Sequence, residues 1–142
     1  MSADASPLTA ADLDFLDRPL HGFLTTAAGP TPPQPRPVWF EVTDAGTLQL
    51  FTAADAAKVT RTRRDPRVSL VVAAPVGEPE RWISVAGPAT LASDGAIELA
   101  NRLAARYWDL DDPVRVRDLD AMLTLDHLRL VIHPETVQRS PY

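Results

Sequence analysis

The stretch "PVWFEVTDAGTLQLFTA", residues 37–53, has the pattern of two strands joined by a tight turn. Residues 37–43 are rich in β-branched and aromatic side chains, and residues 47–53 alternate apolar with polar side chains. Between them, "DAG" at 44–46 is a turn signal. The pattern predicts an antiparallel hairpin.

Apolar runs bounded by proline, glycine or charged residues predict the remaining strands. The six expected strands are 20–27, 37–43, 47–53, 67–74, 81–92 and 127–134. Helices are expected at 9–16, with Thr9 and Asp12 as a capping box, at 54–64, at 93–108 with Ile97 on its buried face, and at 114–122. Six strands with short turns and marginal helices predict a mainly β (α+β) protein, a six-stranded antiparallel barrel with short flanking helices.

Length and composition limit the class of protein. A chain of 142 residues with 45% hydrophobic and 23% charged residues is typical of one soluble globular domain, expected to span residues 1–142. The N-terminal residues lack the pattern of a signal peptide, and no apolar run is long enough to span a membrane, so we expect a cytoplasmic protein without a membrane partner. A net charge of −5 argues against a nucleic-acid partner.

The sequence contains none of the common catalytic motifs. The chain has no cysteine, which excludes thiolate nucleophiles and cysteine-bound metals. Its three histidines have no spacing that suggests a shared metal, and no glycine-rich phosphate loop or nucleophile–base pattern is present. We therefore expect no metal site and name no catalytic residue; if the protein is an enzyme, a cofactor supplies the chemistry.

The stretch "AAKVTRTRRDPRVSL", residues 56–70, concentrates cations in an acidic protein, and Lys58 is the only lysine of the chain. Lys58 is expected in the first turns of a short helix, where free backbone N–H groups and the helix dipole favour an anion. Arg61 follows three residues later on the same face, and Thr52 offers a hydroxyl at the end of the preceding strand. Trp39, on the neighbouring strand, offers a flat apolar surface. The alternatives are a solvated helix face for the cations and ordinary core packing for Trp39.

These segments, with "RWISVAGPATL", "LAARYW" and "LRLVIHPETV" further on, resemble the FMN- and deazaflavin-binding split β-barrel superfamily over residues 10–138. The chain most resembles its pyridoxamine 5′-phosphate oxidase-like, coenzyme F-420-dependent group. The resemblance implies a split barrel that forms homodimers, with the cofactor in a groove at the interface. It also implies cofactor-binding residues: Pro37, Val38 and Trp39 at the ring system, and Thr52, Lys58, Val59 and Arg61 at the phosphate.

The activity implied by the resemblance is hydride transfer between a reduced deazaflavin, coenzyme F-420, and a small unsaturated or oxidised organic substrate. One alternative is an FMN-dependent oxidoreductase on the same fold. A second is a non-catalytic cofactor- or haem-binding protein, for which His21 or His127 would be the histidine to test. A third is a barrel without ligand that serves as a dimeric interaction module.

Two features depart from the family pattern. Arg61 stands where family members commonly carry asparagine, which changes the length and geometry of the phosphate contact. The chain also ends in "VQRSPY", without the arginine- and histidine-bearing segment by which pyridoxamine phosphate oxidases hold their vitamin substrate. Vitamin B6 oxidation is therefore the less favoured activity.

Overall fold

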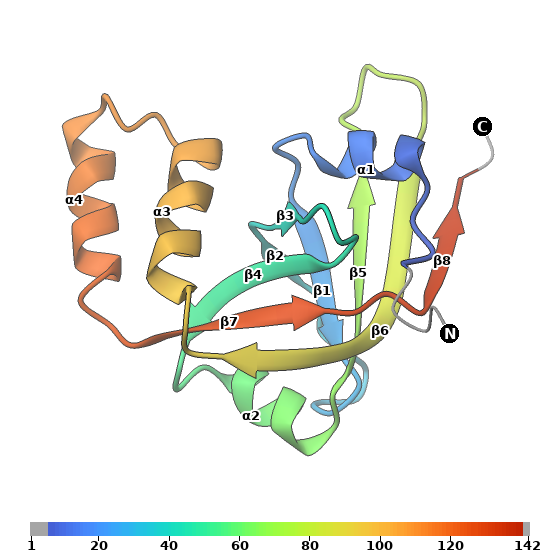
Figure 1. The fold of residues 1–142 in the computed structure, drawn as a ribbon, viewed down its shortest axis with the longest axis horizontal. Coiled ribbons are helices and arrows are strands. Elements are labelled where there is room, and N and C mark those ends of the chain that lie inside the picture. The colour runs from blue at the N-terminus through green and yellow to red at the C-terminus, as the bar shows by residue number, and fades with distance from the viewer. Residues whose placement is uncertain (1–5, 141–142) are drawn as a thin grey trace.

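The computed structural model describes residues 6–140, and the described chain forms eight strands and four helices (Figure 1). The strands are β1 (Gly22–Thr26), β2 (Arg36–Val38), β3 (Glu41–Val42), β4 (Leu48–Ala53), β5 (Arg67–Ala73), β6 (Trp82–Ala92), β7 (His127–Ile132) and β8 (Thr136–Arg139). The helices are α1 (Ala10–Leu16), α2 (Ala57–Arg64), α3 (Ala96–Tyr107) and α4 (Pro113–Met122). All pairings are antiparallel, in the order β2-β1-β5-β6-β7-β4-β3, with β8 added on β6.

The long strand β6 belongs to both halves of this sheet. Residues 82–88 pair with β5, and residues 83–86 of that part also pair with β8. Residues 89–92 pair instead with β7. The chain between β7 and β8 crosses over Gly87, where the His133 carbonyl lies so close that no side chain fits. This shared strand, visibly curved in Figure 1, lets one sheet wrap around a core.

The sheet comes close to closing at a corner formed by Trp39 and Phe40. Strands β2 and β3 are the two ends of the strand order, yet only these two residues separate them along the chain. The Phe40 side chain is fully buried in the core, whereas Trp39 is half-buried. The two residues thus mark the point at which the chain passes from one half of the barrel to the other.

The predicted fold class, a mainly β split barrel with short flanking helices, is confirmed, but the count of six strands is wrong. The predicted strand 37–43 is two strands, since its middle residues turn the corner without ladder pairs. The second difference is β8, which lies beyond Pro134 and was not predicted because its residues, Thr136–Arg139, carry little apolar pattern.

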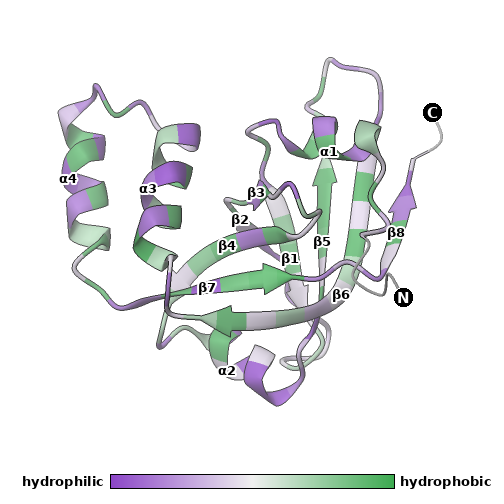
Figure 2. Cartoon of the chain, in the orientation of Figure 1, coloured by the Kyte–Doolittle hydropathy of each residue, from purple (hydrophilic) through white to green (hydrophobic). Residues whose placement is uncertain are grey.

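Inward side chains of all the long strands form the core. In β5, for example, Val68, Leu70 and Val72 are buried, while Ser69 and Val71 point outward. Such alternation is expected when one face of a sheet is buried and the other is open. Figure 2 shows the apolar residues of β5 and β7 as the green segments of these strands.

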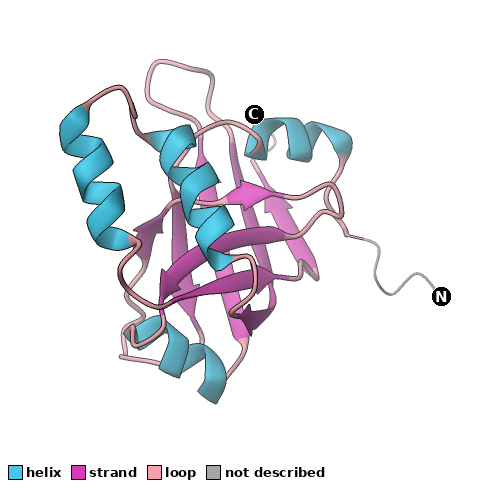
Figure 3. Cartoon of the chain, turned by 60° about the vertical axis from the view of Figure 1, so that its left-hand side comes forward, coloured by secondary structure: helices cyan, strands magenta, loops and turns pink. Residues whose placement is uncertain are grey.

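The helices lie outside this sheet, with α2 at one end and α3 packed against one side, while α4 lies beyond α3 (Figure 3). Helix α1 has the predicted capping box between Thr9 and Asp12. Helix α3 begins at Ala96 after Gly95, whose φ of +77° favours glycine, and not at Ser93 as predicted. The prediction that Ile97 is buried is wrong, because its side chain is 42% exposed. In the described part of the chain, no helix has the length and apolarity to cross a membrane.

Candidate functional site

A cavity of about 310 Å³ opens beside the Trp39–Phe40 corner. Its lining comes from the segment before β1, from β2 and the corner, from β4, from α2 and from the ends of α3 and α4. The lining residues are His21, Pro37, Val38, Trp39, Phe51, Lys58, Trp108 and Met122. Segments that lie far apart in sequence therefore share one largely aromatic and apolar site.

Aromatic rings fix the orientation of Trp39. Tyr107 stacks on it with ring centroids 5.3 Å apart and the planes within 5°. Trp108 meets it edge-on at 4.7 Å, and Phe51 does so at 6.2 Å. Stacked and edge-on pairs are the favoured aromatic geometries, and each ring restricts the rotation of the next. The cavity therefore has a rigid, flat, apolar wall, as sites for planar ligands do.

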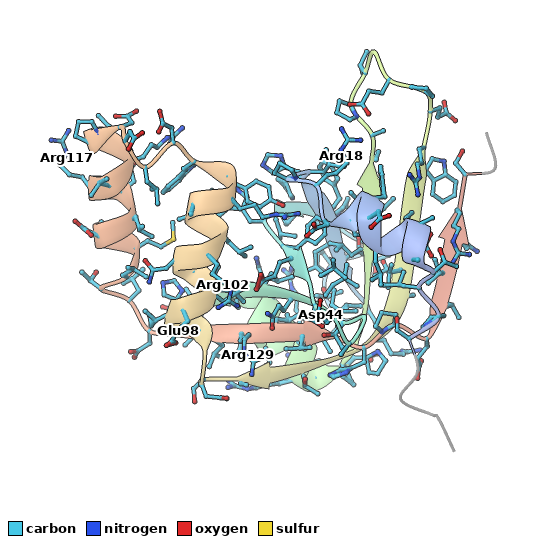
Figure 4. The ribbon with its side chains drawn as sticks, turned by 45° about the horizontal axis from the view of Figure 1, so that its top comes forward. Arg18, Asp44, Glu98, Arg102, Arg117 and Arg129 are labelled. Atoms are coloured by element: carbon cyan, nitrogen blue, oxygen red, sulfur yellow. The ribbon has the colours of Figure 1, made fainter. Side chains whose placement is uncertain are left out.

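Long polar side chains anchor α3, which carries Tyr107 and leads into Trp108. The Tyr107 hydroxyl donates to the Leu20 carbonyl at 2.6 Å. The Arg102 guanidinium pairs with Glu41 on β3 at 2.6 Å, and Figure 4 shows Arg102 on the side of α3 that faces the sheet. Arg106 donates to the Asp17 carbonyl at 2.7 Å, at the end of α1. These contacts bind α3 to several elements of the barrel and so hold Trp108 in place.

His127 fixes the position of Met122. Its Nε2 lies 2.7 Å from the Met122 carbonyl oxygen, so Nε2 carries the hydrogen and donates it. The buried imidazole also meets the Phe51 ring edge-on at 5.4 Å. His127 thus supports two lining residues from behind without lining the cavity itself.

Lys58 brings the positive charge into this cavity. Within residues 6–140, its ammonium makes no ion pair or hydrogen bond, and burial lowers the pKa of this amine. Helix α2 also begins without a side-chain cap at Ala56. The backbone N–H groups of Ala57 and Lys58 have no acceptor among the described residues. An uncompensated ammonium in the first turn of a helix favours an anion, above all a phosphate.

Four of the predicted site residues come together here: Pro37, Val38, Trp39 and Lys58 all line the cavity. Three predicted phosphate-binding residues do not. The side chains of Thr52 and Val59 are buried, and the Val59 N–H already donates to the Ala56 carbonyl at 3.0 Å.

The third of these, Arg61, lines a different cavity on the other side of α2. The arginine that replaces the family's asparagine therefore lies outside the cavity that contains Lys58. Arg61 lies only three residues after Lys58 in the helix, yet its side chain lines a separate cavity.

Four lining residues were not predicted: His21, Phe51, Trp108 and Met122. Phe51 was recognisable, because strand alternation places it on the face opposite its neighbour Thr52. Trp108 and Met122 follow from how the α3–α4 pair packs against the sheet, for which the local sequence has no signal. His21 was considered only as a haem ligand. No group of metal-ligating side chains is found within residues 6–140.

The family model described as pyridoxamine 5′-phosphate oxidase matches residues 8–138. No curated protein matches the chain significantly. Among solved structures, a conserved hypothetical protein from Mycobacterium tuberculosis is 24% identical, with a TM-score of 0.68 over 98% of this chain and 88% of that one.

Two further solved structures are similar. One named F420 reductase is 24% identical, with a TM-score of 0.69 over 88% of this chain and 94% of that chain. A FAD-binding protein from Mesorhizobium loti is 21% identical, with a TM-score of 0.64 over 93% of this chain and 94% of its own. Likeness at these identities shows a shared fold, and the family match covers nearly the whole chain. The chain belongs to the pyridoxamine 5′-phosphate oxidase family, on the split β-barrel fold.

Proposed function

We propose that this protein is an oxidoreductase that transfers a hydride between reduced coenzyme F-420, a deazaflavin, and a small unsaturated or oxidised organic substrate. The observation that carries the proposal is the cavity that joins the Trp39 wall to the unpaired ammonium of Lys58. The name of one structural relative, F420 reductase, supports the choice of cofactor. FMN is the alternative, because it also combines a planar ring system with a phosphate.

The described residues fit a flavin-type cofactor. A planar ring needs a flat apolar surface, which Trp39 provides with Phe51 packed edge-on against it, and a phosphate needs donors without a competing acid. The ammonium of Lys58, in the first turn of α2, is such a donor. When bound, the cofactor supplies the two-electron chemistry that the chain itself lacks.

The chain contributes binding, orientation and exclusion of water. Lys58 would hold the phosphate, and the backbone at Pro37 and Val38 would contact the ring system beside Trp39. Trp108 and Met122 cover the cavity from the side of α3 and α4. Holding two reactants in a fixed geometry is itself a large part of catalysis, which agrees with a site without a nucleophile–base pair.

Fluorescence titration of the purified apo protein with coenzyme F-420, and in parallel with FMN, tests the proposal. We expect F-420 to bind, and Lys58→Ala to weaken binding by about 10- to 100-fold, as expected for loss of a charged hydrogen bond. Arg63→Ala is the matched control, because Arg63 is an exposed cation of the same helix and does not line the cavity. We expect its affinity to stay near that of the wild type.

The other outcomes of the titration distinguish the alternative ligands from one another. Binding of FMN without F-420 would favour the flavin alternative. A third titration with haem tests the non-catalytic alternative, in which His21 is the available lining histidine, since the Nε2 of His127 is already engaged. If neither F-420 nor FMN bound, or if Lys58→Ala bound as tightly as wild type, the proposal would be wrong.

We also propose that the protein is a homodimer whose second chain completes the site. Pro37, Phe23 and Val71 are partners across β2, β1 and β5 and form one row on the outer face of the sheet. Phe23 is 43% and Val71 37% exposed, and Pro37 also lines the cavity. A continuous exposed apolar row is typical of an interface, and this one leads directly to the site.

A charge placed in this row tests the dimer. We expect the wild type to sediment at about twice the 15.5 kDa of one chain, and Val71→Asp to sediment as a monomer, because an interface would bury the new carboxylate unpaired. Val76→Asp, in the fully exposed loop before β6, is the matched control and should stay dimeric. A wild type that sediments as a monomer at all concentrations would contradict the proposal.

A further inference from the structure

The cations of the stretch 56–70 separate into groups with different surroundings. Lys58 lies in the aromatic cavity, and Arg67 pairs with Asp65 at 2.6 Å. Arg61 and Arg64 instead line a second cavity of about 480 Å³ on the other side of α2. Nothing in the proposed cofactor site explains these two guanidinium groups.

One face of α2 forms a wall of this second cavity. Ala57, Thr60, Arg61 and Arg64 follow one another at the spacing that places side chains on the same helix face. Gly29 and Pro30, in the loop between β1 and β2, form the opposite side. The cavity thus lies between a helix and a loop that are separate in sequence.

The loop between β1 and β2 packs closely against the Arg61 side chain. Gly29 has a φ of +132°, which favours glycine, and a side chain there would lie 3.1 Å from both Cδ and Nε of Arg61. The loop backbone therefore lies directly against the guanidinium stem. The side chain of Arg61 is accordingly only partly exposed, unlike that of Arg63.

The cavity offers donors without any compensating acid. No aspartate or glutamate lines it. Among the described residues, neither Arg61 nor Arg64 makes an ion pair or hydrogen bond, and neither does the Thr60 hydroxyl. By contrast, seven other arginines of this acidic protein pair with carboxylates. Figure 2 shows the hydrophilic residues gathered in the second half of α2.

Basic residues in the last turn also stabilise a helix through its dipole. That effect applies to Arg63 as much as to Arg61 and Arg64. It does not account for the shared cavity, for the close approach of Gly29 to Arg61, or for a cavity lining without an acidic residue.

We propose that Thr60, Arg61 and Arg64 form a second anion-binding site, separate from Lys58, that takes a doubly charged oxyanion. The guanidinium group presents paired N–H donors that match the oxygens of a phosphate or a carboxylate, and a hydroxyl adds a further donor. The ligand is thus a phosphate monoester or a dicarboxylate.

Titration at low ionic strength tests the site, with inorganic phosphate and glutarate as separate probes. The signals of the arginine Nε–Hε groups, followed by NMR, report which side chains the anion contacts. We expect the signals of Arg61 and Arg64 to shift on titration and that of Arg63 to stay. The probe that binds more tightly identifies the ligand as phosphate or carboxylate.

Substitutions on the same helix provide the controls. Arg61→Ala and Arg64→Ala are expected to weaken binding at least about 10-fold, as for the loss of a charge-assisted contact. Arg63→Ala should change it less than about twofold, since Arg63 does not line this cavity. Arg61→Lys keeps the charge but loses the paired donors, so we expect it to bind more weakly than wild type.

Three results would contradict the proposed second anion-binding site. Equal weakening by all three arginine substitutions would indicate a general charge effect of a solvated helix. Loss of binding in Lys58→Ala alone would assign the anion to the cofactor cavity, and no binding of either probe would remove the site altogether. Because the cofactor titration relies on Lys58 and this one on Arg61 and Arg64, either proposal can fail without the other.

Discussion

Gly87→Ala is expected to lower the free energy of unfolding by about 4 kcal/mol or more. A Cβ atom at this position would overlap the carbonyl oxygen of His133. The obstacle is backbone and is held in place, because the His133 N–H donates to the Pro88 carbonyl at 2.9 Å and the Glu135 N–H to the Ala86 carbonyl at 2.8 Å. The crossing over β6 therefore has to open, and β8 loses its position beside β6.

Urea denaturation of wild type and variant measures this effect. Gly77→Ala is the matched control: its φ of +101° favours glycine, but no atom lies within 4 Å of the added Cβ. That variant should lose about 1 kcal/mol from backbone strain alone. A Gly87→Ala protein as stable as the Gly77→Ala protein would contradict the close crossing.

Asp12→Ala is expected to lower the free energy of unfolding by about 3 kcal/mol. The Asp12 carboxylate is 2% exposed, and it accepts from the Thr9 N–H at 2.8 Å and from the Arg139 guanidinium at 2.6 Å. The variant loses the capping box of α1 together with the link from α1 to β8. We place the effect at the low end for a buried pair because Arg139 is 40% exposed.

The same pair makes stability depend on pH. The hydrogen bond from Arg139 is the main cause that lowers the pKa of Asp12 below its usual 3.8. A lowered folded-state pKa means that the contribution is complete above 3.8 and is lost as the pH falls through the folded-state value. The stability gap between wild type and Asp12→Ala should therefore shrink in acid.

Unfolding curves at neutral pH and well below 3.8 check this dependence. Asp14→Ala is the control, because Asp14 is an exposed aspartate of the same helix. We expect that substitution to change stability by less than about 0.5 kcal/mol at either pH. A gap for Asp12→Ala that stayed constant into acid would show that its carboxylate is not held by Arg139.

The parts of the fold that were predictable rest on local patterns. The hairpin of β3 and β4 follows from alternation around the "DAG" turn, and the start of α1 follows from the Thr9–Asp12 spacing. The corner at Trp39 and Phe40 was not predictable, because an unbroken apolar run does not show where a strand changes partners. Strand β8 escaped prediction for the opposite reason, since its residues are mostly polar and pair through the backbone with β6.

Some residues of the candidate site could be predicted from the sequence, and others could not. The chemistry of Trp39 and Lys58 follows from their side chains and from the elements on which they lie. The sequence therefore predicted both as site residues, and both line the cavity. Trp108 and Met122 reach the cavity through α3 and α4, which is a consequence of tertiary packing. Arg61 shows the limit of helical periodicity: a residue three positions from Lys58 lies near it on the helix, yet the two line separate cavities.

The position of the only lysine has a practical consequence for handling the protein. The one side-chain primary amine of the protein, that of Lys58, lies half-buried in the aromatic cavity. Its pKa is lowered, which leaves more of the amine in the nucleophilic neutral form. Acylating reagents therefore have one side-chain target, and its rate of labelling reports whether the cavity is occupied. Immobilisation on a sensor surface through that amine would block the cavity, so an attachment chemistry that avoids lysine is required.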